Sequence, residues 1–429
     1  MAKKVLATIK TGEYKINTHH KRLQGKTIIR KRKGNLFAIV FSICFILGLV
    51  AVSVLNIKKI DNYTTFRRFS VQAMEPSTKD YKSMVVIESS TGRVLEGYNE
   101  NERLPMASTT KIATAIVAIN SCEDINHIYP VPRDAVGIEG TSMYLKYGER
   151  FSVRELLYGL MLPSGNDAAT ALAILIGGSE EAFVKKMNDL ASELGLNDTS
   201  FKNPHGLHDD EHYTTSLDLA KLTAYAMQNE CFRNIVATKN ITIQPREKVG
   251  EIRHLKNKQR LIGDEDLKKK DIEVTGAKSG FTPEAGRCLV TTATKNDMDM
   301  VCVLLNAPNM FESTKEVLLR VGAEYNMHEI LRPKTHLGTI NVLGSDTKKV
   351  NIYCEENFIY PLKDEEVGRI KQITNYPDSI VAPVLKNQEC GEVTIMLGDE
   401  ELFRSTIKTI EEAKKVGFKS ILDKVIKQF

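Results

Sequence analysis

One stretch of the sequence constrains where the rest of the chain can fold. From Leu36 to Ile57 no residue is charged, and an apolar run of this length can cross the ~30 Å hydrocarbon core of a bilayer as a helix. A basic cluster at 30–33 lies immediately before it. Because positively charged flanks stay in the cytoplasm, we expect 1–35 to be a basic cytoplasmic arm, 36–57 a transmembrane anchor, and the remainder to lie outside.

A cleaved signal peptide is the alternative to this anchor. The apolar region of a signal peptide spans ~7–15 residues and is followed closely by a cleavage site with small residues. Ala51-Val52-Ser53 lies inside the run and Val71-Gln72-Ala73 lies far downstream, so the uncleaved anchor is preferred. The arm carries eleven Lys and Arg with Glu13 as its only acid. Next to an anchor, such a charge excess indicates topology or anionic-lipid contact rather than nucleic-acid binding.

Changes in residue pattern divide the external part of the chain. Two apolar runs around Ser90-Thr91-Gly92 predict a hairpin, and helical spacing follows Ser108. Further helices are expected at 152–176, interrupted by Pro163 and Gly165, and at 179–194 and 312–331; strands are expected at 273–280, 287–295 and 299–305. This order predicts an α/β (α+β) sandwich with an antiparallel sheet and a helical subdomain. The predicted segments are a stalk (58–81), this catalytic domain (82–332), a small all-β domain (333–403) and an amphipathic C-terminal helix (404–429).

The cysteines do not indicate a metal site or a disulfide framework. Cys44 lies in the apolar run, and the other six are scattered without a C-x-x-C pair: Cys122, Cys231, Cys288, Cys302, Cys354 and Cys390. Scattered cysteines in a large chain are usually small buried apolar residues. We therefore expect no metal and no cofactor, and we interpret the His- and acid-rich stretch 205–212 as a solvated loop.

Three short motifs carry the chemistry. Ser108-Thr109-Thr110-Lys111 is an S-x-x-K at a helix start, where residues three apart share a face and the Lys amine can take the Ser proton. Ser164-Gly165-Asn166 follows Pro163, and Lys278-Ser279-Gly280 lies on an expected strand. Each motif alone is common, but their order matches the S-x-x-K, S-x-N and K-T-G set of penicillin-reactive serine enzymes.

With these motifs, the chain resembles the D-alanyl-D-alanine carboxypeptidases, which are low-molecular-mass penicillin-binding proteins. The resemblance is strong over about 82–330 and includes PMASTTKIATAIVAI (105–119), the segment 140–173, FKNPHGL (201–207) and AKSGFTPEAGRCLV (277–290). It implies a penicillin-binding, β-lactamase-like transpeptidase domain followed by a small β domain. Ser279 departs from the family, which usually has Thr there, but the hydroxyl is kept.

The chemistry and the resemblance together imply the residue roles. Ser108 is the expected nucleophile, Lys111 its base, and Ser164 a proton relay to the leaving group. Asn166, Lys278, Ser279, Gly280 and Phe281 are the expected substrate-binding residues. In this scheme Lys278 and Ser279 hold the terminal carboxylate, and the backbone N–H groups of Ser108 and Phe281 form the oxyanion site. Adjacent residues of a regular strand point to opposite faces, so Lys278 and Ser279 would not both face the substrate. Whether Lys278 binds the carboxylate or mainly lowers the pKa of Lys111 is therefore left open.

The implied substrate is a peptidoglycan stem peptide ending in D-Ala-D-Ala, and β-lactam antibiotics are implied ligands. Two alternatives remain: a β-lactamase-like hydrolase and a non-catalytic wall-binding module. No glutamate between 166 and 278 has Asn three residues later, which disfavours the first, and an intact nucleophile and base disfavour the second. Segment 404–429 combines apolar residues at helical spacing with lysines, so we expect it to contact membrane lipid.

Overall fold

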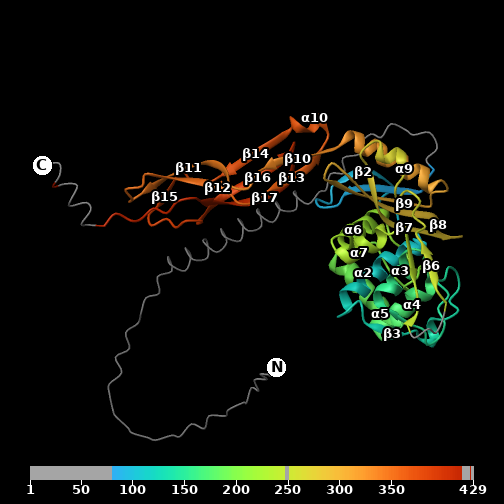
Figure 1. The fold of residues 1–429 in the computed structure, drawn as a ribbon. Coiled ribbons are helices and arrows are strands. Elements are labelled where there is room, and N and C mark those ends of the chain that lie inside the picture. Colours follow the sequence, from blue (N-terminus) through green and yellow to red (C-terminus); the bar gives the residue numbers. More distant parts are fainter. Residues whose placement is uncertain (1–79, 247–250, 418–425, 427–429) are drawn as a thin grey trace, which may run out of the picture. The chain divides into compact units, whose positions relative to one another are not determined.

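The computed structural model describes residues 80–246, 251–417 and 426. A five-stranded antiparallel sheet in the order β2-β1-β9-β8-β7 forms the scaffold of the first domain (Figure 1). The expected hairpin and the later strands are confirmed. Their bounds are β1 Ser83–Glu88, β2 Val94–Tyr98, β7 Glu273–Thr282, β8 Gly286–Lys295 and β9 Met298–Leu305. Since β7 is an edge strand, its outer side is available to a cleft.

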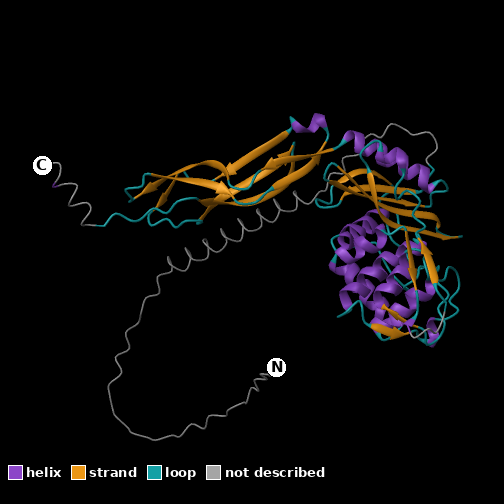
Figure 2. Cartoon of the chain, in the orientation of Figure 1, coloured by secondary structure: helices purple, strands orange, loops and turns teal. Residues whose placement is uncertain are grey.

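A group of helices covers one face of this sheet, as Figure 2 shows. The sequence places them at η1 Ala107–Thr110, α2 Lys111–Ser121, η2 Arg133–Ala135, α3 Val153–Met161, α4 Asn166–Gly177, α5 Glu180–Glu193, α6 Ser216–Met227 and α7 Glu230–Ala237. Short strand pairs border them: β3 Ile128–Pro130 with β4 Arg150–Ser152, and β5 Asn240–Ile243 with β6 Arg253–Lys256. The expected break near Pro163 is confirmed, because α3 ends and α4 begins around it.

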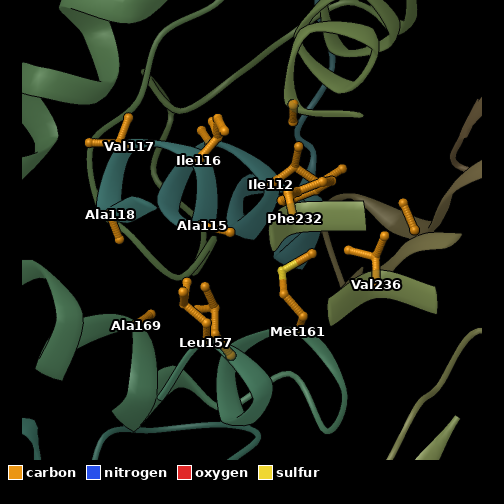
Figure 3. Packing of buried hydrophobic residues seen from close by; sticks show 14 of the residues in the cluster. Ile112, Ala115, Ile116, Val117, Ala118, Leu157, Met161, Ala169, Phe232 and Val236 are labelled. Atoms are coloured by element: carbon orange, nitrogen blue, oxygen red, sulfur yellow. The ribbon is translucent and has the colours of Figure 1, made fainter. Parts of the chain in front are cut away.

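Helix α2 is the hub of the helical subdomain. Every residue from Lys111 to Ala118 is buried, as expected for a helix that is apolar on all sides. Figure 3 shows Ile112, Ala115 and Ile116 of α2 among side chains of neighbouring helices, including Leu157. Its alanines let these helices approach closely, so the N-terminus of α2 is held in a rigid, densely packed position.

Helix α9, Met310–Glu324, packs on β8 and β9 from the other face of the sheet. The expected helix 312–331 is therefore wrong at its C-terminal end, because strand β10 (Asn326–Leu331) follows and pairs with β13 (Phe358–Leu362). This pairing joins β10 to a strand from the later part of the chain. A short helix, α8 (Glu265–Lys268), precedes β7.

The second domain is built around a six-stranded sheet in the order β14-β16-β17-β12-β11-β15. Its remaining elements are β11 Thr335–Leu343, β12 Lys349–Cys354, α10 Asp364–Val367, β14 Ile370–Asn375, β15 Ser379–Val381, β16 Glu389–Leu397 and β17 Glu400–Thr409. The all-β expectation is confirmed apart from the single turn of helix α10.

Two terminal expectations have different outcomes. The C-terminal helix cannot begin at 404, because 404–409 belong to β17 and alternate buried Ser405, Ile407 and Thr409 with more exposed neighbours; strand pairing with β16 overrides the helical pattern. Most of 418–429 lies outside the described residues. Among 80–246, 251–417 and 426, no helix has the length and apolarity needed to cross a bilayer, and the expected anchor 36–57 lies outside these residues.

Candidate active site

The turn that carries Ser108, the expected nucleophile, lies at the N-terminus of the hub helix and is called the nucleophile turn below. Ser108 lies in η1, immediately before Lys111 begins α2. Two threonine hydroxyls tighten this turn: Thr109 Oγ1 donates to Met106 O at 2.6 Å and Thr110 Oγ1 donates to Ala107 O at 2.7 Å. The expected helix start at S-x-x-K is confirmed, with a 3₁₀ turn in place of a regular first α-helical turn.

The side-chain nitrogen of Lys111 is fully buried and lies within hydrogen-bond distance of three oxygens. Its Nζ donates to Ser108 Oγ at 2.9 Å, to Asn166 Oδ1 at 2.7 Å and to the backbone carbonyl of His205 at 2.6 Å. The i, i+3 spacing therefore brings the Lys111 nitrogen within hydrogen-bond distance of the Ser108 hydroxyl. The carbonyl of His205 is a contact that the motifs did not predict.

Burial lowers the pKa of Lys111 well below its usual range, and the cationic Lys278 and Lys258 lower it further. Lys278 is itself buried, and its pKa falls to about 7 through burial and the nearby charge of Lys258. Removing ammonium groups from water and placing them near one another both favour the neutral amine. Both effects make the Lys111 amine better able to accept the proton of the neighbouring serine hydroxyl. Sequence reasoning missed Lys258, which belongs to none of the three motifs.

The S-G-N turn brings two polar side chains to the same place. Ser164 is almost completely buried, and its hydroxyl has no hydrogen-bond partner among the described residues. Both ends of the Asn166 amide are engaged within the protein, because Nδ2 donates to the carbonyl of Glu139 at 2.6 Å while Oδ1 accepts from Lys111. Asn166 therefore orients Lys111, a contact that the sequence did not predict.

Strand β7 passes directly beside the nucleophile. A Cβ added at Gly280 would lie 2.8 Å from the backbone nitrogen of Ser108 and 3.1 Å from that of Thr109. Only the absence of a side chain allows this approach. The motif glycine is therefore explained by a close contact between two backbones.

The sheet register places Lys278 and Ser279 on opposite faces. Lys278 lies across from Val290, which packs in the core on the helical side, whereas Ser279 lies across from Leu289, which packs on the α9 side. Cross-strand partners share a face, so Lys278 points into the helical subdomain, where its Nζ donates to Ser279 O at 2.8 Å. This geometry favours the pKa-lowering alternative for Lys278 over direct contact with a carboxylate.

These groups border one cleft of about 970 Å³. Of the expected site residues, six line it: Ser108, Ser164, Asn166, Ser279, Gly280 and Phe281. Lys111 and Lys278 lie beneath its surface, fully buried. The cleft is thus shaped by the turn before α2, the S-G-N turn and the edge of β7.

His212 corrects the solvated-loop interpretation of 205–212. It is 3% exposed, accepts from the Lys202 N–H at Nδ1, and lies 2.7 Å from Thr110 Oγ1 through Nε2. Because Nδ1 accepts, the neutral ring carries its proton on Nε2 and donates to Thr110, whose own hydroxyl donates to Ala107 O. Burial lowers the pKa of His212 to about 4 and that of His205 to about 3. The His212 ring therefore braces Thr110 in this turn as a neutral group, whereas the His205 ring accepts from the N–H of Leu207.

Comparison with known proteins agrees with this geometry. The family model for D-alanyl-D-alanine carboxypeptidases matches residues 70–309, and that for the C-terminal domain of penicillin-binding protein 5 matches 325–415. The chain is 33% identical over 80% of its length to the D-alanyl-D-alanine carboxypeptidase DacF of Bacillus subtilis, covering 89% of that protein. It is 30% identical over 77% of its length to DacD of Escherichia coli, covering 86% of it.

A solved structure extends the likeness. Penicillin-binding protein 6B from Escherichia coli superposes with a TM-score of 0.61 at 27% identity, over 79% of this chain and 97% of that one. The fold and its cleft therefore define a serine acyl-transfer protein of the penicillin-binding class. Within that class, the chain belongs to the D-alanyl-D-alanine carboxypeptidase family.

Proposed function

We propose that this serine-type D-Ala-D-Ala carboxypeptidase removes the terminal D-alanine of peptidoglycan stem peptides through an acyl-enzyme on Ser108. The observation that carries the proposal is the buried Lys111 amine, 2.9 Å from Ser108 Oγ and with a lowered pKa. Such an amine can take the hydroxyl proton as the oxygen attacks the carbonyl carbon of the penultimate residue.

The remaining steps are assigned to the neighbouring groups. The backbone N–H groups of Ser108 and Phe281 stabilise the developing oxyanion, a role that β7 suits because it is an edge strand beside the nucleophile. The C–N bond then breaks, and the Ser164 hydroxyl relays to the leaving amine the proton that Lys111 took from Ser108, which returns Lys111 to its neutral form. Water next attacks the ester and gives a proton to Lys111. As the ester C–O bond breaks, Lys111 returns this proton to the Ser108 oxygen, which releases the shortened peptide and restores both groups.

Substrate binding is assigned to the edge of β7 and to Asn166. Ser279, facing the cleft from the α9 side, donates to the terminal carboxylate, while Lys278 acts mainly by keeping Lys111 neutral. Asn166 holds Lys111 and contacts the substrate amide by exchanging its bond to Glu139. A β-lactam, whose strained amide mimics the scissile bond, enters the same site and acylates Ser108.

Incubation with a fluorescent penicillin, followed by mapping of the labelled peptide, tests the nucleophile. Label is expected on Ser108 and absent from Ser108→Ala, and D-alanine release from a D-Ala-D-Ala peptide should disappear in the same variant. Lys111→Ala should slow acylation by several orders of magnitude, because it loses the base. Label on another serine would contradict the assignment. Rapid turnover of the penicillin would favour the β-lactamase-like alternative.

We also propose that 36–57 anchors the protein in the cytoplasmic membrane as a single span, with the catalytic domain outside. The basic cluster before the uncharged run supports this orientation. Protease added to intact protoplasts should remove the catalytic domain and spare an N-terminal tag. A mature N-terminus near Met74 would contradict the anchor. Peripheral lipid contact by the basic apolar segment after 410 is tested by deleting 418–429, which leaves β17 intact.

A further inference from the structure

The charge of the cleft exceeds what one terminal carboxylate needs. Among the residues that the structure describes, four basic side chains line it, Lys256, Lys258, Arg260 and Arg287, and no Asp or Glu does. A cleft lined by one sign of charge concentrates ligands of the opposite sign. Three of these cations come from β6 and the segment after it, whereas Arg287 comes from β8 and stands apart.

Arg287 lies at the rim of the cleft, on strand β8 next to β7. It is the cross-strand partner of Phe281, so both side chains project from the same face of the sheet. The guanidinium carbon lies 5.9 Å from the centre of the Phe281 ring, and Phe281 is 63% exposed. Together the two side chains form an apolar surface with a positive charge at its edge.

The backbone that carries Arg287 is held firmly. In the turn before it, the N–H of Ala285 donates to Thr282 Oγ1 at 3.1 Å, and the carbonyl of Arg287 accepts from the N–H of Ala307 at 2.7 Å. Across the described part of the chain, no carboxylate forms an ion pair with the Arg287 side chain. A guanidinium on an ordered strand is therefore available to a ligand.

The order of Ser279, Gly280 and Phe281 along β7 indicates which part of a bound substrate lies near Arg287. The proposed contact with the terminal carboxylate is at Ser279, and Gly280 lies against the nucleophile. The leaving residue thus occupies the Ser279 side of Ser108. The acyl half of the peptide must continue in the other direction along the strand, past Phe281 towards Arg287.

From this placement we propose that Arg287 forms a second carboxylate subsite, which binds a carboxylate carried by the acyl half of the peptide substrate. The inference rests on the proposed function, because it uses the direction of the bound peptide. A guanidinium pairs with a carboxylate through two parallel N–H bonds, while Phe281 supports the apolar part of the same residue. The enzyme would then favour donor peptides that are acidic near the scissile bond over neutral ones.

Two matched donor peptides test the subsite. Both end in D-Ala-D-Ala and differ only in one acyl-side residue, which is Glu in one and Gln in the other. The wild-type kcat/KM should favour the Glu peptide by roughly threefold to tenfold, since the pair is partly exposed. Arg287→Gln should bring the ratio close to one, Arg287→Glu should reverse it, and Arg287→Lys should keep part of it.

Arg260→Gln is the control within the same cleft. Arg260 also rests on a phenylalanine, 5.2 Å from the ring centre of Phe311, but it follows β6 rather than the acyl-side end of β7. Its substitution should leave the Glu-to-Gln ratio unchanged. The preference should also shrink as salt is raised, because exposed ion pairs are screened.

Direct binding separates this subsite from the reaction. The Kd values of the two peptides for Ser108→Ala should differ by a similar factor, with no acylation involved. Equal affinities, or a preference that survives Arg287→Gln, would overturn the subsite even if penicillin labels Ser108 normally. Loss of labelling at Ser108 with the affinity difference intact would instead count against the proposed nucleophile and leave the subsite supported.

Discussion

The contact between Gly280 and the nucleophile turn gives the sharpest prediction. In Gly280→Ala, the new Cβ would lie 2.8 Å from the Ser108 nitrogen and 3.1 Å from both Ala107 Cβ and the Thr109 nitrogen. Ordinary contact requires the strand and the turn to separate by roughly half an ångström or more. The atoms in the way belong mainly to backbone, so no flexible side chain can absorb the change.

The expected cost falls on catalysis more than on folding. A reacting group displaced by about 1 Å can lose on the order of 100-fold in rate, so acylation by a fluorescent penicillin should slow by roughly tenfold to 100-fold. Overpacking should destabilise the fold by about 1–3 kcal/mol, which corresponds to a modest fall in Tm for a domain of this size. Stopped-flow acylation and thermal unfolding measure the two effects separately.

Gly368→Ala provides the comparison. This glycine lies in the second domain with no neighbour within 4 Å of an added Cβ, and its φ of −70° suits alanine. It should acylate and unfold like the wild type. If Gly280→Ala were acylated at the wild-type rate, the proposed role of the close backbone contact in positioning Ser108 would be refuted.

Three further predictions follow from the same site. In Lys278→Met, loss of a buried cation raises the pKa of Lys111, so the acid limb of the acylation rate should move to higher pH; an unchanged profile would contradict the pKa-lowering role. In His212→Asn, the free energy of unfolding should depend less on pH in the acid range than it does in the wild type. The folded ring stays neutral down to about pH 4 while the unfolded ring gains a proton near 6.5, so the wild type loses about 3 kcal/mol as pH falls through that window. Denaturant unfolding of the wild type and of His212→Asn at pH 7 and pH 4 measures this difference. If both proteins lost the same free energy of unfolding between the two pH values, the prediction would be contradicted. Ser279→Ala should lower kcat/KM on a peptide with a free C-terminal carboxylate and bring it closer to the kcat/KM on the C-terminal amide, whereas Ser279→Thr should leave both values nearly unchanged. Equal kcat/KM of the wild type on the two peptides would show that the site does not bind the carboxylate.

Local patterns in the sequence were enough for much of the fold and for the core of the site. The spacing of Ser108 and Lys111 brings them together on any helical turn. Pro163 interrupts a helix whatever the helix packs against, because proline lacks the backbone N–H. Apolar runs on either side of Ser90-Thr91-Gly92 predicted the first hairpin of the central sheet. The missed elements were those whose conformation is set by pairing with another strand: 326–331 forms β10 through pairing with β13, and 404–409 forms part of β17 through pairing with β16.

The sequence by itself determined which chemical groups this protein carries and in what order, and its motifs were sufficient to place it in a family. Only the tertiary structure decided how those groups are tuned. The face that Lys278 adopts follows from its register with Val290, and the influence of Lys258 follows from the segment after β6 lying over the same cleft. His212 braces Thr110 from a segment far along the chain. Burial, charge proximity and backbone contact depend on distances across the fold, and no local pattern of residues contains those distances.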